Sequence, residues 1–113
     1  MIKAIIFDLD NTLLDFVKMK RFAVRAAVTA MNEAGLGVDE KKAFDDIFDL
    51  YLNKGWEHQQ VFDDYLQQTT GKVSNKVLAA GIVSYRRARE ATLLVYPNVN
   101  KTLIELLKMG IKL

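Results

Sequence analysis

Apolar residues follow two different spacings along this chain. Residues 2–7 are apolar except for Lys3 and rich in isoleucine, which is typical of a short strand buried on both faces of a parallel sheet. From Phe16 onward, apolar residues recur every three or four positions, the period of an α-helix that faces a core. The pattern therefore predicts one buried strand followed by a long helical region.

Glycines and capping residues divide the helical region into successive helices. The first begins at Phe16 and ends at Gly35 and Gly37, and the second follows Asp39, a predicted N-cap, and ends at Gly55. Their expected inward side chains are Phe16, Met19, Ala23, Ala26, Ala30 and Ala34, then Phe44, Ile47, Phe48, Tyr51 and Leu52.

Two more helices complete this middle region. The third carries Val61, Phe62, Tyr65 and Leu66 and closes near Gly71. The fourth starts after Ser74 or Asn75, with Leu78, Ile82, Tyr85 and Ala88 on its inward face. The middle of the chain is thus predicted to be a helical bundle.

A last helix and a second strand are expected after Pro97, the only proline. Asn98 is a candidate cap, the inward residues are Val99, Leu103, Leu106 and Leu107, and Gly110 ends the helix before an apolar stretch at residues 111–113. Two short strands cannot bury both faces of a sheet. We therefore expect the N-terminal portion of a larger α/β domain; an all-helical domain with one short strand is the alternative.

Composition narrows the possible chemistry. The 113 residues include no cysteine, and half of them are apolar, so a packed core is expected while disulfides and thiol chemistry are excluded. The net charge is only +2, with acids and bases interspersed, which is not the pattern of a nucleic-acid-binding protein. No apolar run approaches the length of a signal peptide or a membrane span, so we expect a cytoplasmic protein.

Two carboxylates follow the first predicted strand directly. Asp8 and Asp10 lie where a strand of a parallel sheet ends, and side chains beyond that edge usually form the working crevice. Acidic pairs are common on surfaces, but charged groups directly after a buried strand are costly without a role. Such a pair suits Mg²⁺ binding and a division of work between a nucleophile and a proton donor.

The segment IIFDLDNTLL at residues 5–14 resembles the first signature of the haloacid dehalogenase superfamily, a hydrophobic strand followed by Asp-x-Asp-x-Thr. The later segment VYPNV at residues 95–99 is similar to the point where that family's chain returns to its core. The resemblance implies a Rossmann-like α/β core with a parallel sheet, truncated here, and an inserted all-α cap. It divides the chain into residues 1–14 (first strand and catalytic loop), 15–94 (helical cap) and 95–113 (return to the core).

By this resemblance Asp8 is the nucleophile of a phosphatase that forms an aspartyl-phosphate, and Asp10 is the general acid and base. Mg²⁺ would be held by Asp8 and Asp10, and Thr12 would support the loop. Family members that cleave carbon–halogen bonds usually lack the second aspartate, so Asp10 favours phosphate esters. A phosphomutase that uses the same intermediate remains open.

Further expectations concern binding and partners. Lys20 and Arg21, just after the catalytic loop, are candidates for attracting a small phosphorylated metabolite, although cations on a helix more often face solvent. The family's later signatures are absent from this sequence, so we expect little activity unless a second polypeptide, or a second copy, completes the core. The competing hypothesis is a noncatalytic helical module that docks through its apolar faces and the edge at residues 111–113.

Overall fold

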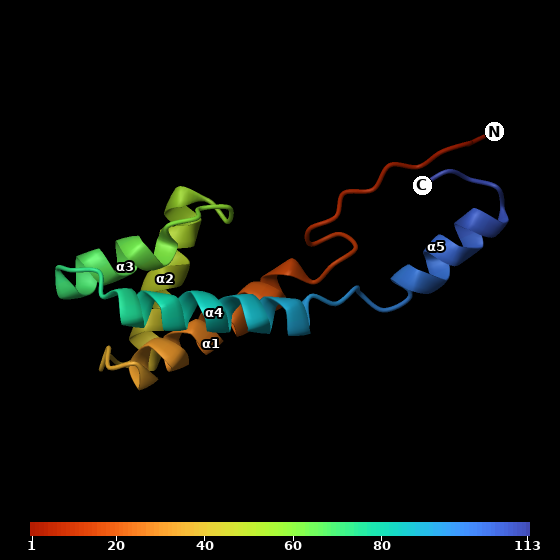
Figure 1. Ribbon diagram of the computed structural model, residues 1–113. Coiled ribbons are helices and arrows are strands. Elements are labelled where there is room, and N and C mark those ends of the chain that lie inside the picture. The colour runs from red at the N-terminus through yellow and green to blue at the C-terminus, as the bar shows by residue number, and fades with distance from the viewer.

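The computed structural model describes all of residues 1–113 and contains five helices and no strand (Figure 1). The helices are α1 (Phe16–Glu33), α2 (Glu40–Lys54), α3 (Val61–Thr70), α4 (Asn75–Thr92) and α5 (Val99–Lys108). The first four pack into one bundle, and residues 1–15 and α5 extend away from it on one side. The molecule is accordingly long, 59 × 24 × 21 Å.

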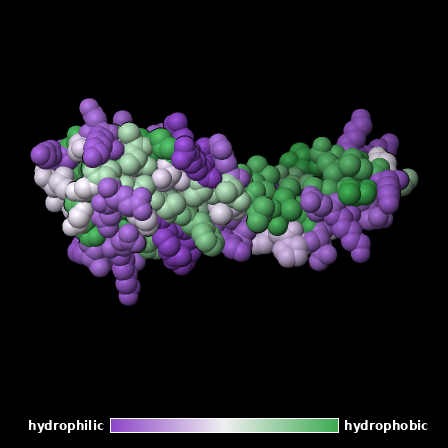
Figure 2. Space-filling model, turned by 60° about the horizontal axis from the view of Figure 1, so that its bottom comes forward, coloured by the Kyte–Doolittle hydropathy of each residue, from purple (hydrophilic) through white to green (hydrophobic).

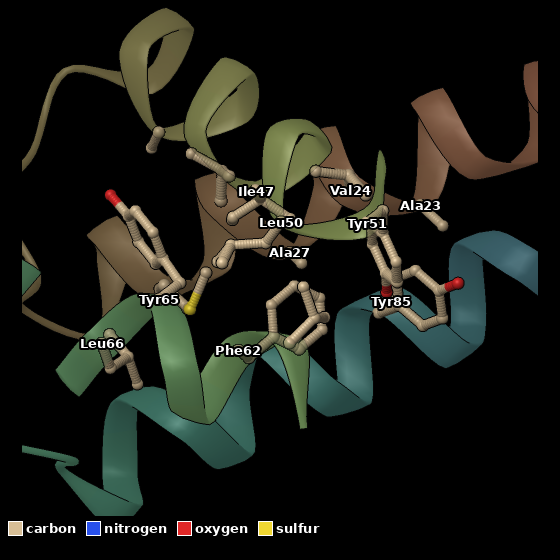
Figure 3. Close-up of a cluster of buried hydrophobic side chains, with 14 of the residues drawn as sticks. Ala23, Val24, Ala27, Ile47, Leu50, Tyr51, Phe62, Tyr65, Leu66 and Tyr85 are labelled. Carbon is tan, nitrogen blue, oxygen red and sulfur yellow. The ribbon is translucent and has the colours of Figure 1, made fainter. Parts of the chain in front are cut away.

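The core of the molecule lies entirely inside the bundle. Its centre is the long contact of α1 with α4, and α2 and α3 close the sides. Figure 3 shows the buried side chains converging between these helices, with Ile47 and Leu50 of α2 facing Phe62 and Tyr65 of α3. Sixteen buried apolar residues form this single cluster.

The sequence predicts the helix ends well because local hydrogen bonds set them. Asp39 caps α2 by accepting a hydrogen bond from the Lys42 backbone N–H at 2.9 Å. Gly55 and Gly71 end α2 and α3 with φ angles of +96° and +74°, a conformation that favours glycine. The five predicted helices are confirmed with small shifts of their ends.

The inward faces of α1 and α2 differ in part from expectation. Met19 and Ala23 are buried as predicted, but Ala26 and Ala30 are only half-buried. The buried residues of α1 are Met19, Lys20, Ala23, Val24, Ala27, Val28 and Met31. Leu52 is 66% exposed, so its predicted place in the core is wrong. Four alanines on the expected stripe carry too little apolar surface to fix the rotation of a helix.

The predicted strands are reduced to single bridges. Ala4 forms a parallel bridge with Lys112, where the Ile5 N–H donates to the Lys112 carbonyl at 2.8 Å and the Lys112 N–H donates to the Lys3 carbonyl at 2.9 Å. The parallel direction agrees with the predicted arrangement. Because a ladder needs longer neighbours on both sides, no strand forms, and the parallel sheet stays a prediction.

Helix α5 has the expected bounds but not the expected burial. None of its residues is buried, and Ile104 and Leu107 are 51% and 57% exposed. The prediction that Val99, Leu103, Leu106 and Leu107 face a core is therefore wrong for this chain. The first three are only half-buried and Leu107 is exposed, because no other helix packs against α5. Figure 2 shows the result as a large apolar area on the lobe that lies away from the bundle. The domain limits at residues 14/15 and 94/95 stay a prediction.

Candidate active site

The segment after the first extended stretch folds into a tight loop. The backbone carbonyl of Leu9 accepts hydrogen bonds from the N–H groups of Thr12, Leu13 and Leu14, at 3.0 to 3.3 Å. Asn11 takes a left-handed conformation, φ +58°, which asparagine tolerates better than most residues. These contacts turn the chain back on itself directly after Asp8.

The loop presents the two predicted carboxylates to solvent. Asp8 and Asp10 are both exposed, and the Thr12 hydroxyl donates to Asp8 Oδ2 at 3.2 Å. Thr12 therefore contacts the predicted nucleophile directly, in agreement with a supporting role. One carboxylate oxygen of Asp8 is held in this way, while no hydrogen bond occupies Oδ1.

The loop is fastened to the returning chain. The Asp15 N–H donates to the Leu94 carbonyl at 3.1 Å, and the Tyr96 N–H donates to the Leu13 carbonyl at 2.9 Å. The Tyr96 hydroxyl donates to Asn11 Oδ1 at 3.0 Å. Partial burial, with the Asp15 carboxylate nearby, raises the pKa of Tyr96 above its usual value, so its hydroxyl keeps the proton that this bond needs.

The residues present fit only part of a metal site. No group of three or more His, Cys, Asp or Glu side chains is close enough to hold an ion. Asp8 and Asp10 nevertheless provide the hard oxygen ligands that Mg²⁺ prefers, and Mg²⁺ commonly takes only one or two carboxylates together with water and substrate phosphate. The pair is thus a fitting but incomplete donor set.

A small cavity lies between the loop and the bundle. It has a volume of about 210 Å³. Its lining comes from the loop, from α1, from the α2–α3 connection and from α4: Asp10, Phe16, Met19, Lys20, Trp56, Glu57, Tyr85, Arg89 and Leu93. The predicted proton donor Asp10 therefore shares a cavity with bundle residues, whereas Asp8 and Thr12 do not line it.

The structure separates the two candidate cations. Lys20 is 6% exposed and lines this cavity, and its ammonium donates to the Tyr85 hydroxyl at 2.5 Å. Arg21 is exposed, does not line the cavity, and places its guanidinium 5.9 Å from the ring centre of Phe48. Of the two cations, only Lys20 lines the cavity between the loop at residues 8–14 and the bundle.

Sequence reasoning missed two of the residues beside Lys20. The sequence predicts Tyr85 only as an inward-facing residue of its helix, and it gives Arg89 no functional role. They lie one turn apart on α4, and both line the cavity. Their spacing was visible in the sequence, but which helix they face depends on how α4 packs against α1.

Trp56 and His58, both in the connection between α2 and α3, have structural partners. Trp56 packs edge-on against Phe16 and Phe48, with ring centres 6.0 and 5.7 Å apart. His58 Nε2 lies 2.7 Å from Asp64 Oδ2, which also accepts from the Lys54 ammonium at 2.7 Å. The hydrogen bond from Lys54, followed by that from His58, lowers the pKa of Asp64.

The whole chain is similar to a known family of hydrolases and to several curated proteins. A family model described as haloacid dehalogenase-like hydrolase matches residues 2–113. The chain is 39% identical, over its whole length, to a glyceraldehyde 3-phosphate phosphatase of Methanocaldococcus jannaschii, of which it covers 50%. Proteins of the same name from Methanopyrus kandleri and Pyrococcus abyssi are 37% and 34% identical, with 49% and 48% of their lengths covered. The chain thus spans about half the length of the curated relatives it matches.

None of its helices has the length and apolar character needed to cross a membrane.

Proposed function

Because the chain belongs to the haloacid dehalogenase-like hydrolases, we propose that it carries the nucleophilic part of a Mg²⁺-dependent phosphatase that works through an aspartyl-phosphate. The observation that carries this proposal is the loop at residues 8–14, which presents Asp8 and Asp10 together and holds Asp8 through Thr12. The proposed architecture is a parallel-sheet core, begun by residues 1–14 and 95–113, with residues 15–94 as its cap.

The proposed reaction has two steps at phosphorus. Asp8 Oδ1 attacks the phosphorus atom while the Thr12 hydroxyl holds Oδ2, and the ester P–O bond breaks as Asp10 gives its proton to the leaving oxygen. In the second step Asp10 takes a proton from water, whose oxygen attacks the same phosphorus and releases the Asp8 carboxylate. The products are an alcohol and inorganic phosphate.

Asp8 and Asp10 are the residues that would hold Mg²⁺. When bound, the ion supplies positive charge that offsets the repulsion between a carboxylate and a phosphate dianion. The remaining ligands would come from outside residues 1–113, since these residues hold no further acidic group close to the pair.

The proposed substrate is a small phosphorylated metabolite, with a phosphorylated three-carbon sugar as the specific candidate. Five curated relatives carry the name glyceraldehyde 3-phosphate phosphatase. The cavity of about 210 Å³ next to Asp10 agrees with a small leaving group, because typical drug-sized pockets measure about 300–1,000 Å³. No observation favours a phosphomutase or a dehalogenase.

The proposed partner is the remaining part of the same core. The exposed apolar side chains of α5 and of the N-terminal stretch, Ile2, Ile6, Ile104, Leu107 and Met109 among them, form the kind of surface that a sheet and its covering helices would bury. We further propose that the completed protein works in the cytoplasm and binds neither nucleic acid nor membrane.

The test compares two proteins. One is the chain of residues 1–113, and the other is this chain fused to the remaining half of the Methanocaldococcus jannaschii relative. We expect the fusion to hydrolyse an aryl phosphate when Mg²⁺ is present and the chain alone to show little turnover.

The controls assign the activity to the loop. Asp8→Asn should reduce kcat of the fusion by about 1,000-fold or more, as expected for loss of a nucleophile. Asp45→Asn, a matched change at an exposed position of α2, should leave kcat unchanged. Activity that survives Asp8→Asn would refute the proposal.

A further inference from the structure

One charged side chain is buried without a counter-charge. Lys20 is the only charged residue among the 18 buried ones, and it takes part in none of the molecule's ion pairs. Burying an ammonium costs free energy unless other groups replace its water. A methionine or leucine would fill the same volume without this cost, so the position needs an explanation beyond packing.

Aromatic side chains hold the Lys20 ammonium in place. Its Nζ lies 4.1 Å from the ring centre of Tyr51 and 5.1 Å from that of Tyr85, and it donates to the Tyr85 hydroxyl. Figure 3 shows the side chains of Tyr51, from α2, and Tyr85, from α4, close together. Burial, with Tyr85 nearby, raises the pKa of Tyr51 well above its usual value, so Tyr51 stays neutral and does not supply the missing charge.

The Lys20 ammonium has more N–H donors than the structure gives it acceptors. It carries three N–H donors, and the structure gives it one hydrogen-bond acceptor, the Tyr85 hydroxyl. The π faces of Tyr51 and Tyr85 stabilise its charge, but they do not replace a directed acceptor. The remaining N–H groups are therefore available to a ligand with oxygen atoms.

Lys20 lies where such a ligand would reach it from the catalytic loop. It lines the cavity of about 210 Å³ that Asp10 also lines. It also lines a second cavity, of about 440 Å³, whose other lining residues come from α2, the α2–α3 connection, α3 and α4. The two cavities share five lining residues, Lys20, Trp56, Glu57, Tyr85 and Arg89, so they adjoin at Lys20.

We infer that Lys20 binds an oxygen atom of the substrate's leaving group and so selects short, oxygen-bearing phosphate esters. This inference rests on the proposed phosphatase function. Asp10, the residue that would protonate the leaving oxygen, shares the cavity with Lys20, whereas Asp8 and Thr12 do not line it. The cavity therefore receives the part of the substrate that leaves, not the phosphoryl group. Tyr85 is a positioning residue that holds the ammonium toward this cavity.

The test uses the fusion protein and two substrates with three-carbon leaving groups. Glyceraldehyde 3-phosphate carries oxygen atoms on that group, and n-propyl phosphate carries none beyond the ester oxygen. Lys20→Met keeps an unbranched side chain of similar length and removes its charge. We expect it to lower kcat/KM for glyceraldehyde 3-phosphate by about 10- to 100-fold, the loss typical of a hydrogen bond to a charged group. For n-propyl phosphate we expect a change below about 3-fold by the same reasoning.

Two further variants sharpen the comparison. Tyr85→Phe should move the ratio of the two kcat/KM values in the same direction as Lys20→Met, by a smaller factor. Lys76→Met, an exposed lysine on α4 outside both cavities, should not change the ratio. The melting temperature of Lys20→Met should match that of the parent, since an apolar side chain of similar volume replaces a buried charge.

The outcomes separate the inference from the function on which it rests. Equal losses on both substrates would mean that Lys20 supports the fold or the phosphoryl group, and would overturn the assignment. Equal kcat/KM values for glyceraldehyde 3-phosphate in the parent and in Lys20→Met would overturn the assignment as well. A parent fusion without hydrolysis that depends on Asp8 would instead refute the proposed function, and the assignment with it.

Discussion

At the scale of single residues, the close packing of α4 against α1 depends on Gly81. This glycine of α4 is buried against α1, and a Cβ added to it would lie 2.9 Å from both Cγ and Sδ of Met31. Met31 is itself fully buried, so it has little room to move away. The absence of a side chain at position 81 therefore allows α1 and α4 to pack closely.

Gly81→Val should consequently destabilise the bundle. Overpacking a filled core costs about 1–3 kcal/mol, and we expect the free energy of unfolding to fall by about 2 kcal/mol in denaturant titrations. Ala79→Val, at an exposed position of the same helix, is the matched control and should cost less than about 1 kcal/mol, since only helix propensity changes. Equal losses in the two variants would show that position 81 is not tightly packed.

Asp64 gives a prediction about pH. Hydrogen bonds from Lys54 and His58 lower the pKa of Asp64 in the folded chain. These bonds therefore add to the free energy of unfolding at pH values above about 3.9, the pKa of an aspartate in the unfolded chain. This contribution is lost as the pH falls through the lower, folded value. In an NMR titration of the carboxyl carbons, Lys54→Met should raise the pKa of Asp64 toward its usual value. Lys42→Met, which removes the partner of Asp46 instead, should leave Asp64 unchanged.

The sequence identifies some site residues and cannot rank others. Asp8, Asp10 and Thr12 were found because they follow an apolar stretch in a spacing that resembles a known signature. Lys20 and Arg21 are adjacent cations on one helix, and nothing in their spacing decides which of them is buried. That choice depends on the rotation of α1, which its packing against α4 and α2 fixes in the folded bundle.

At the scale of elements, helix ends follow from local chemistry but burial does not. The limits of α2 and α3 were predictable because Asp39, Gly55 and Gly71 act within one turn of the chain. The apolar face of α5 was equally visible in the sequence, yet no element of the chain packs on that helix. An amphipathic pattern predicts that a face will be covered when a partner is present, and the pattern alone does not supply that partner.

Helix α5 should therefore be the least protected helix. With no buried residue, it opens without disrupting a core, and short isolated helices are marginal in water. In hydrogen exchange at neutral pH, we expect the amides of α5 to exchange at least about 100-fold faster than those in the middle of α1, which corresponds to roughly 3 kcal/mol.

The fusion to the second half of the relative gives the complementary result. There the amides of α5 should slow markedly, because the added core would cover its apolar face. Exchange in α5 that is as slow in the chain alone as in α1 would contradict the view that this helix lacks its partner.

At the scale of the whole molecule, the chain consists of a packed helical bundle and a lobe without a buried core. Every buried residue lies between Met19 and Tyr85, within α1 to α4, while the loop that carries Asp8 and Asp10 belongs to the exposed lobe (Figures 1 and 2). The helical part could be predicted because its contacts are local in sequence. The parallel sheet was predicted from the apolar stretch at residues 2–7 and from the family resemblance. These 113 residues form only single bridges there, since a sheet needs long neighbouring strands.

The central claim is that Asp8 becomes covalently phosphorylated during turnover. The direct measurement is mass spectrometry of the acid-quenched fusion protein, digested at Lys3 and Lys18 so that residues 4–18 form one peptide. We predict that a fraction of this peptide carries one phosphoryl group on Asp8 during hydrolysis of glyceraldehyde 3-phosphate, and that the Asp8→Asn protein carries none. Full hydrolytic activity without that phosphorylated peptide, or with the phosphoryl group on another residue, would contradict the account.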